Sequence, residues 1–168
     1  MEKEIINKVA NSILKTIDLE ELYPKGERIV FDISSWLFEG LILREKDFRA
    51  QVKDFDWQKY ENTYVTLTCS SDAIIPSWAY LLLTTALNPY AKKIVVGDLV
   101  LLETLIFQEI ISSLDISEFK NAPVIIKGCT NKPIPQSAYT LLISKLQTTA
   151  KSIMFGEACS TVPLFKNK

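Results

Sequence analysis

Thiol and carboxylate side chains follow the predicted strands of this sequence at the points where those strands end. Cys69 follows one β-like run, Cys129 follows a second, and Glu157 with Cys159 follows a third. Ligands of parallel sheets bind outside the carboxyl ends of the strands, so we expect a ligand site at such an edge. Its candidate residues are Cys69, Ser70, Asp72, Cys129, Thr130 and Glu157.

The cysteines suit a metal site as well as a thiol site. Cys69 and Cys129 each precede a predicted helix N-terminus by a few residues, where the partial positive charge favours thiolate over thiol. Two or three thiolates are ligands that zinc, iron or an iron–sulfur cluster prefers. The candidate metal ligands are Cys69, Cys129 and Cys159, although the sequence has no Cys-x-x-Cys pair.

Two alternatives stay open for the same segments. Free cysteine is among the most buried residue types, so the three thiols would equally serve as small apolar side chains packed at strand ends. The helix N-termini could instead bind an anionic small molecule through backbone amides. Side-chain hydrogen bonds would then come from Ser70, Ser71, Asp72, Thr130 and Asn131, which are also typical helix caps and turn residues.

The composition excludes several classes of function. The chain has 168 residues, with 19 basic and 20 acidic side chains and no histidine. Without histidine, Ser-His-Asp, Cys-His and His-metal chemistry are excluded. The balanced charge gives no basic excess for nucleic acid or an anionic membrane. Apolar stretches fall short of the roughly 20 residues that span a bilayer, and Met1–Glu4 lacks the apolar core of a signal peptide. We therefore expect a cytoplasmic protein with reduced cysteines.

An internal repeat organises the sequence. Residues 75–97 and 134–156, at a constant offset of 59, are identical at 11 of 23 positions. Both copies contain Ile-Pro-x-x-Ala-Tyr-x-Leu-Leu, and upstream a one-residue slip brings Cys69 opposite Cys129. Each copy is typical of a βαβ unit, because a β-branched run precedes a proline suited to the first turn of an apolar helix, and a second such run follows.

The other segments continue the alternation of helices and strands. We expect an N-terminal helix near residues 5–17, a strand Glu27–Asp32, a surface helix Glu45–Phe55 and a helix Leu99–Leu114 capped by Asp98. The pattern predicts an α/β fold, a three-layer domain with a largely parallel sheet and a duplicated βαβ unit. One domain over residues 1–168 is expected. Its parts are the first helix, strand and surface helix over 1–60, copy one over 64–98, a connecting helix over 99–115, copy two over 124–157 and a tail over 158–168.

Motifs spread over nearly the whole chain resemble one known family. They are Phe31–Ile33, Trp36–Phe38 with Gly40–Leu43, Glu45–Arg49, Asp56–Trp57, Cys69–Ile74 with Pro76, Trp78–Tyr80 and Phe155–Pro163. Together they are similar to the uncharacterised bacterial domain-of-unknown-function family numbered 2480. The resemblance implies a single-domain cytoplasmic protein with no established activity and no assigned site residues. Members of that family are sometimes encoded near iron–sulfur assembly genes, which implies iron–sulfur assembly proteins as partners and favours the sulfur-rich site.

These observations favour a non-catalytic cytoplasmic binding or accessory protein over an enzyme. Its cysteine-containing site would lie at the carboxyl edge of the sheet and would handle a metal or an iron–sulfur cluster. One alternative is a thiol-dependent enzyme in which Cys69 or Cys129 attacks an electrophilic small molecule. A third possibility is an interaction module that forms a homodimer through its apolar tail, Thr161–Phe165.

Overall fold

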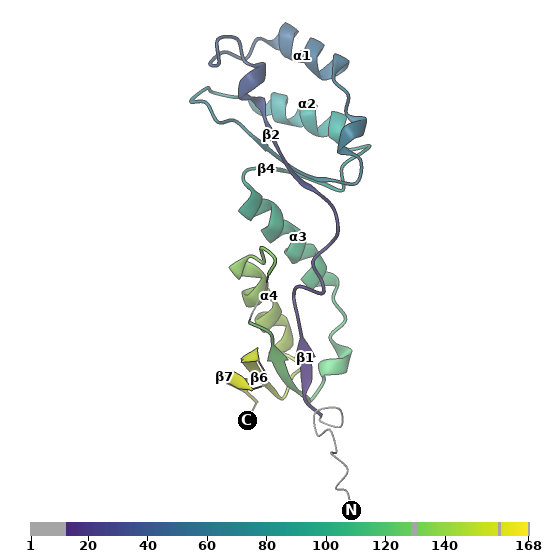
Figure 1. Ribbon diagram of the computed structural model, residues 1–168, viewed down its shortest axis with the longest axis vertical. Coiled ribbons are helices and arrows are strands. Elements are labelled where there is room, and N and C mark those ends of the chain that lie inside the picture. The colour runs from purple at the N-terminus through teal and green to yellow at the C-terminus, as the bar shows by residue number, and fades with distance from the viewer. Residues whose placement is uncertain (1–12, 129–130, 158, 168) are drawn as a thin grey trace, which may run out of the picture. The chain divides into compact units, whose positions relative to one another are not determined.

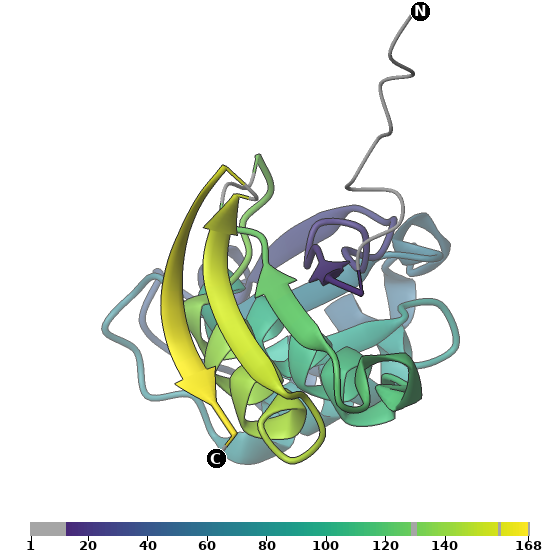
Figure 2. The same ribbon diagram turned by 90° about the horizontal axis from the view of Figure 1, so that it is seen from below.

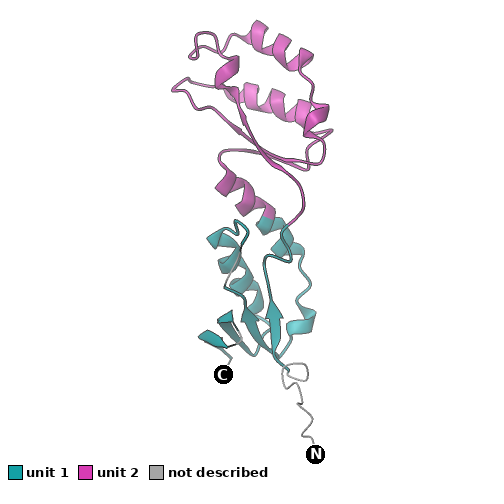
Figure 3. Cartoon of the chain, in the orientation of Figure 1, with its two compact units in different colours: residues 1–23, 107–168 teal, residues 24–106 magenta. Residues whose placement is uncertain are grey.

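The computed structural model describes residues 13–128, 131–157 and 159–167. Within these residues the protein is mixed α/β, with four α-helices and two small sheets whose strands are mainly parallel (Figure 1). The chain divides into two compact units (Figure 3), unit 1 with residues 1–23 and 107–168 and unit 2 with residues 24–106. The predicted parallel strands are therefore confirmed, but they form two sheets where one was expected. The expectation of one domain over the whole chain stays a prediction.

Unit 2 contains a three-stranded sheet in the order β2-β3-β4, in which all strands are parallel. Its elements are β2 Arg28–Asp32, the 3-10 helix η1 Ile33–Trp36, α1 Glu45–Asp54, η2 Gln58–Tyr60, β3 Tyr64–Thr68, α2 Ser77–Leu87 and β4 Lys93–Val96. The core joins Phe31, Val65 and Leu67 of the sheet to Phe48 of α1 and Leu83 of α2. Four consecutive residues of β3, Tyr64–Leu67, are buried, as a strand covered on both faces requires.

The helix α3, Leu99–Ser113, follows β4 and ends in unit 1. Asp98 Oδ1 accepts a hydrogen bond of 2.8 Å from the amide of Leu101, which confirms the predicted cap. Pro76 and Pro135 occupy the N-cap positions of α2 and α4, one residue before the predicted place, with extended backbone. The predicted helices Glu45–Phe55 and Leu99–Leu114 therefore agree with α1 and α3 to within one residue at each end.

Unit 1 contains a four-stranded sheet in the order β1-β5-β6-β7. Its elements are β1 Lys15–Ile17, η3 Ser117–Phe119, β5 Pro123–Ile126, α4 Gln136–Leu146, β6 Ser152–Glu157 and β7 Ser160–Lys166. The first three strands are parallel, and β7 returns antiparallel to β6 (Figure 2). Phe107, Val124, Leu142 and Ile153 are fully buried in its core.

The two units share a strand register and several turn hydrogen bonds. Tyr64 is paired with Lys93 in unit 2, and 59 positions later Pro123 is paired with Ser152 in unit 1. The turn before each strand also corresponds, because Asp56 accepts from the amide of Gln58 while Asp115, 59 residues on, accepts from that of Ser117. The correspondence thus begins well before residue 75, where the sequence identity was first evident.

The structure corrects the expectation of an N-terminal helix and shows where the apolar tail lies. Residues 15–17 of the predicted N-terminal helix form strand β1, and residues 5–12 lie outside the described part. Ile17 is buried and is paired with Ile126 of β5, so tertiary pairing outweighs helical patterning there. The apolar tail forms β7, which packs on the same chain. No described helix has the length and apolar character that a membrane crossing demands.

Candidate functional site

The carboxyl ends of β2 and β3 are joined by a polar cluster in unit 2. Asp32, the last residue of β2, accepts hydrogen bonds at Oδ1 from the amide of Ser34 at 2.9 Å and the amide of Ser70 at 3.0 Å. The hydroxyl oxygens of Ser34 and Ser70 lie 3.1 Å apart. We call Asp32, Ser34 and Ser70 the Asp32 cluster. It lies at the edge of the sheet where parallel-sheet proteins bind their ligands.

Asp32 is held in its ionised form by these donors. Its pKa is lowered to about 2, first by the hydrogen bond from the side chain of Ser70 and next by that from the amide of Ser34, while desolvation acts in the opposite sense. Hydrogen bonds to a carboxylate favour its charged form. The cluster therefore presents a permanent negative charge beside two serine hydroxyls at neutral pH.

Cys69 lies next to the Asp32 cluster and is half-buried. Its Sγ is 3.3 Å from the hydroxyl of Ser71 and 3.7 Å from the carbonyl oxygen of Ser71. The same side chain packs partly against the core of unit 2. The predicted position of Cys69, after β3 and before α2, is therefore confirmed. Its thiol contacts the polar residues of the sheet edge on one side and the apolar core on the other.

The phenol of Tyr80 lies near the same edge. Burial raises its pKa, and the electrostatic influence of nearby Cys69 and Asp32 raises the pKa further. Tyr80 comes from the first turn of α2, so this helix contributes a neutral hydroxyl to a region that already holds a carboxylate and a thiol. The arrangement provides hydrogen-bond donors and acceptors of several strengths within one small region.

At the corresponding edge of unit 1, the aspartate is paired with a lysine. Asp18 follows β1 as Asp32 ends β2, and its Oδ1 accepts from the amide of Glu20 at 2.9 Å. Its Oδ2 is bound by Nζ of Lys127 at 3.0 Å, and this contact is the main reason that the pKa of Lys127 is raised. In unit 2, the position that corresponds to Lys127 at the offset of 59 is Thr68. Thr68 is paired with Asp32 and carries no charge. Unit 1 therefore uses this position for an ion pair, while unit 2 keeps its carboxylate without a paired lysine.

The register also corrects the predicted match between Cys69 and Cys129. With the offset of 59 kept through both strands, the position of Cys69 corresponds to Gly128 rather than to Cys129. A Cβ on Gly128 would lie 2.9 Å from the ring of Phe155, whereas the residue that corresponds to Phe155 in unit 2 is the smaller Val96. The glycine therefore avoids a close contact with the large ring of Phe155.

The other predicted site residues are distributed over both units. Asp72 is exposed in the loop after Ser70 in unit 2, whereas Glu157 ends β6 and Cys159 lies in the β6–β7 turn of unit 1. Cys129 and Thr130 lie outside the described residues. Among the residues that the structure describes, no three His, Cys, Asp or Glu side chains are close enough to share a metal ion. The structure therefore brings Cys69 and Ser70 together with Asp32 at one edge of unit 2.

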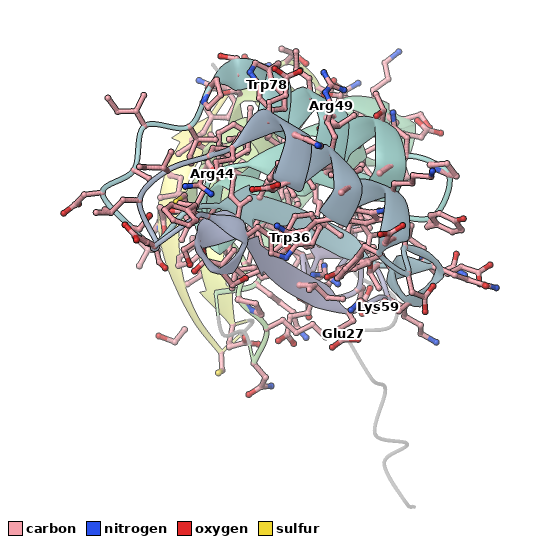
Figure 4. The ribbon with its side chains drawn as sticks, turned by 90° about the horizontal axis from the view of Figure 1, so that it is seen from above. Glu27, Trp36, Arg44, Arg49, Lys59 and Trp78 are labelled. Carbon is pink, nitrogen blue, oxygen red and sulfur yellow. The ribbon has the colours of Figure 1, made fainter. Side chains whose placement is uncertain are left out.

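Aromatic and basic side chains cover the α1 side of unit 2 and hold its helices together. The guanidinium of Arg49 on α1 lies 5.3 Å from the ring centre of Trp78 on α2 (Figure 4). Trp36 packs edge-on against Phe48 and Phe55 at 5.6 and 5.2 Å. These contacts join residues of the same unit, so we interpret them as contacts that stabilise the fold of unit 2.

Unit 1 contains an apolar cavity of about 420 Å³ between α4 and the sheet. Its lining residues are Ile126, Gln136, Tyr139, Thr140, Ile143, Ser144, Phe155 and Leu164. Its polar side groups are mostly satisfied locally, since the hydroxyls of Thr140 and Ser144 donate to carbonyl groups of their own helix. This cavity therefore lacks the charged group that the edge of unit 2 provides.

The site residues expected from the sequence did not include Asp32, Ser34 or Tyr80. The signal for Ser34 is its position two residues after an aspartate that ends a strand, a spacing typical of an Asx turn. The contact between Ser34 and Ser70 had no comparable signal, because it joins residues 36 positions apart.

Comparison with known proteins gives one match. The family model described as "Protein of unknown function (DUF2480)" matches residues 3–167. No curated protein matches, and no solved structure matches.

Proposed function

Since the chain belongs to the DUF2480 family, whose description names no activity, we propose from the geometry of unit 2 that it is a non-catalytic binding or accessory protein. Its ligand would be a small polar molecule held at the carboxyl edge of β2 and β3 by Asp32, Ser34 and Ser70, beside Cys69. The observation that carries this proposal is the ionised Asp32, which is fixed by two backbone amides and has no lysine at the position that Lys127 occupies in unit 1.

The chemistry of the Asp32 cluster selects for a ligand that donates hydrogen bonds. Oδ1 of Asp32 already accepts from two amides, and its other carboxylate oxygen has lone pairs that suit an amine, amide or hydroxyl group of a ligand. The serine hydroxyls can donate or accept, so they tolerate either polarity in the rest of the molecule. An anionic ligand is disfavoured because it would meet the charge of Asp32.

Equilibrium dialysis against a filtered small-molecule extract of cells, followed by mass spectrometry, tests this proposal. Wild-type protein should enrich a molecule about tenfold or more over Asp32→Asn, because a hydrogen bond to a charged group contributes about 1.5–3 kcal/mol. The matched control is Asp18→Asn, which changes the corresponding carboxylate of unit 1 and should enrich the same molecule. Equal enrichment by wild type and Asp32→Asn would overturn the proposal.

The metal or iron–sulfur form of the proposal depends on Cys69. Its other expected ligands are Cys129, which lies outside the described residues, and Cys159 of unit 1. Protein purified without air should then contain zinc or iron that Cys69→Ser loses. The same metal content in both proteins would remove this form and leave the small-molecule form standing.

A thiol-dependent reaction is the second candidate, and the contact of Cys69 with Ser71 favours it. A hydroxyl 3.3 Å from the sulfur can donate to a thiolate and hold it for attack on an electrophile. Alkylation of Cys69 by iodoacetamide, followed by peptide mass spectrometry, should then be faster than that of exposed Cys159 at pH 7. Slower modification of Cys69 would count against an enzyme.

We also infer that the two units arose by duplication of one βαβ element, followed by divergence of the sheet edge. The shared offset of 59 in strand pairing and turns supports this, as does the exchange of Cys69 and Val96 for Gly128 and Phe155. A cytoplasmic location remains part of the proposal, because the thiols would need a reducing compartment. Iron–sulfur assembly proteins as partners also remain part of the metal form of the proposal.

A further inference from the structure

The outer edge of β4 in unit 2 differs from the corresponding edge in unit 1. In unit 1, β6 is covered on its outer side by β7, which runs antiparallel to it. In unit 2, β4 is the last strand of the sheet, and no strand of the described residues pairs with it on the side away from β3. An exposed edge strand presents backbone N–H and C=O groups that can pair with another strand.

Exposed apolar side chains are found on β4 and on the helix α2. Val96 is 49% exposed, and Leu81 of α2 is 65% exposed. The residues that correspond to them in unit 1 are Phe155 and Thr140, which line one cavity together with Leu164 of β7. Val96 and Leu81 therefore occupy the places against which an added antiparallel strand packs in unit 1.

The apolar surface continues into the first turn of α3. Leu99, Val100 and Leu101 are 42%, 67% and 40% exposed, and they follow β4 after only two residues. A run of large exposed apolar side chains beside an open strand edge is typical of an interaction surface. This surface belongs entirely to unit 2.

The charges at the two ends of β4 identify the partner strand. Lys92 and Lys93 precede the apolar residues Ile94–Val96, and Asp98 follows them after Gly97. If two copies of this segment pair antiparallel about Val95, Lys92 lies opposite Asp98 of the other copy. A parallel arrangement would put like charges opposite each other, which destabilises a strand pair.

We propose that the outer edge of β4 is a homodimer interface in which two copies of this chain pair their β4 strands antiparallel about a twofold axis. The two three-stranded sheets then continue into one. Leu81, Val96 and the first turn of α3 provide the apolar contacts, and the opposed lysine and Asp98 side chains fix the register. Asp98 is already ordered by its hydrogen bond to the amide of Leu101, and Lys92 by its bond of 3.0 Å to the carbonyl of Lys25.

Sedimentation velocity of the full chain over a range of concentrations tests the interface. Wild type should form a dimer, and Val96→Lys should weaken it roughly 100-fold, because like charges brought together at an interface cost several kcal/mol. The matched control is Val162→Lys in β7, which changes a valine that is 61% exposed on unit 1 and should leave the dimer intact. Circular dichroism of each variant verifies that the fold is kept.

A second measurement tests the register. Asp98→Asn keeps an efficient helix cap but removes the charge, so it should weaken the dimer several-fold at low salt and have little effect at high salt. Hydrogen exchange should show protection of Ile94–Val96 that increases with protein concentration. A wild-type chain that stays monomeric would overturn the proposal, as would a dimer unchanged by Val96→Lys. Loss of the dimer in Val162→Lys would place the interface on the tail instead.

Discussion

The amide of Ser70 donates a hydrogen bond of 3.0 Å to Oδ1 of Asp32, and this contact ties the end of β3 to the end of β2. The two residues are 38 positions apart, so the bond exists only when both strands are in register. The charge of the candidate site and the folding of the sheet edge are thus coupled.

The pH dependence of stability should report the charge of Asp32. Because its pKa is lowered to about 2, its contribution to the stability of unit 2 is complete above the ordinary aspartate value near 4. That contribution is lost as the pH falls through about 2. The free energy of unfolding of wild type should therefore exceed that of Asp32→Asn at pH 5, and the difference should shrink between pH 4 and pH 2.

Tryptophan fluorescence is the suitable probe for this measurement. Trp36, Trp57 and Trp78 are the three tryptophans of the chain, and all belong to unit 2. Glu39→Gln, a loop substitution in the same unit, controls for the general effect of removing a carboxylate. A difference between wild type and Asp32→Asn that stays constant from pH 5 to pH 2 would show that Asp32 is not held ionised by Ser34 and Ser70.

The buried ion pair of unit 2 should contribute strongly to its stability. Nε of Arg28 lies 2.7 Å from Oε1 of Glu103, and the two side chains are only 12% and 7% exposed. Removing one partner of a buried pair costs about 3–5 kcal/mol, so Glu103→Ala should shift urea unfolding by that amount. The exposed pair of Glu45 and Arg49 is the contrast, because Glu45→Gln removes that pair alone and should cost about 0.5 kcal/mol. Similar costs for both variants would contradict this account.

The ion pair of unit 1 should give a dependence on alkaline pH. The pKa of Lys127 is raised, chiefly by its hydrogen bond to Asp18, so the stabilisation is present below the ordinary lysine value and is lost as the pH rises through the raised value. Wild type should unfold at a higher temperature than Lys127→Met at pH 8, and the difference should decrease as the pH rises through the raised pKa of Lys127. Calorimetry measures this difference, and a difference that does not decrease at alkaline pH would exclude the charge as its cause.

The exchange of small and large side chains between the units can be tested directly. Gly128→Ala places a Cβ at 2.9 Å from the ring of Phe155 and should destabilise unit 1 by about 1–3 kcal/mol through overpacking. Adding Phe155→Val, the residue found at the corresponding position 96, should recover part of that loss. A double variant whose cost equals the sum of the two single costs would show that the two positions are not coupled.

Most of the fold could be predicted from local patterns in the sequence. The strand Tyr64–Thr68 is a continuous run of residues that favour β structure, and the helices of the repeat start directly after Pro76 and Pro135. The hydrophobic pattern and the positions of the prolines were therefore sufficient to predict these elements. The division into two sheets could not be predicted, because it depends on β5 pairing with β1 from the start of the chain instead of with β4. Such pairings join strands that are far apart in the sequence, and local patterns do not determine them.

The site was predictable in its location but not in its composition. Residues at the ends of parallel strands were expected to carry it, and Cys69 and Ser70 do lie there with Asp32. The cysteine match failed because it placed a one-residue slip ahead of the loop, whereas the strand register keeps the offset of 59. The packing of Gly128 against Phe155 is a contact between residues 27 positions apart, and no local signal announces it.

The most direct test of the ligand site is a nuclear magnetic resonance titration of the full chain with a library of small polar molecules. Molecules that bind should shift the amide signals of Ser34, Ser70 and Ser71, and Asp32→Asn should abolish those shifts while Asp18→Asn preserves them. Shifts that cluster in unit 1, or that persist in Asp32→Asn, would contradict a site at the carboxyl edge of β2 and β3.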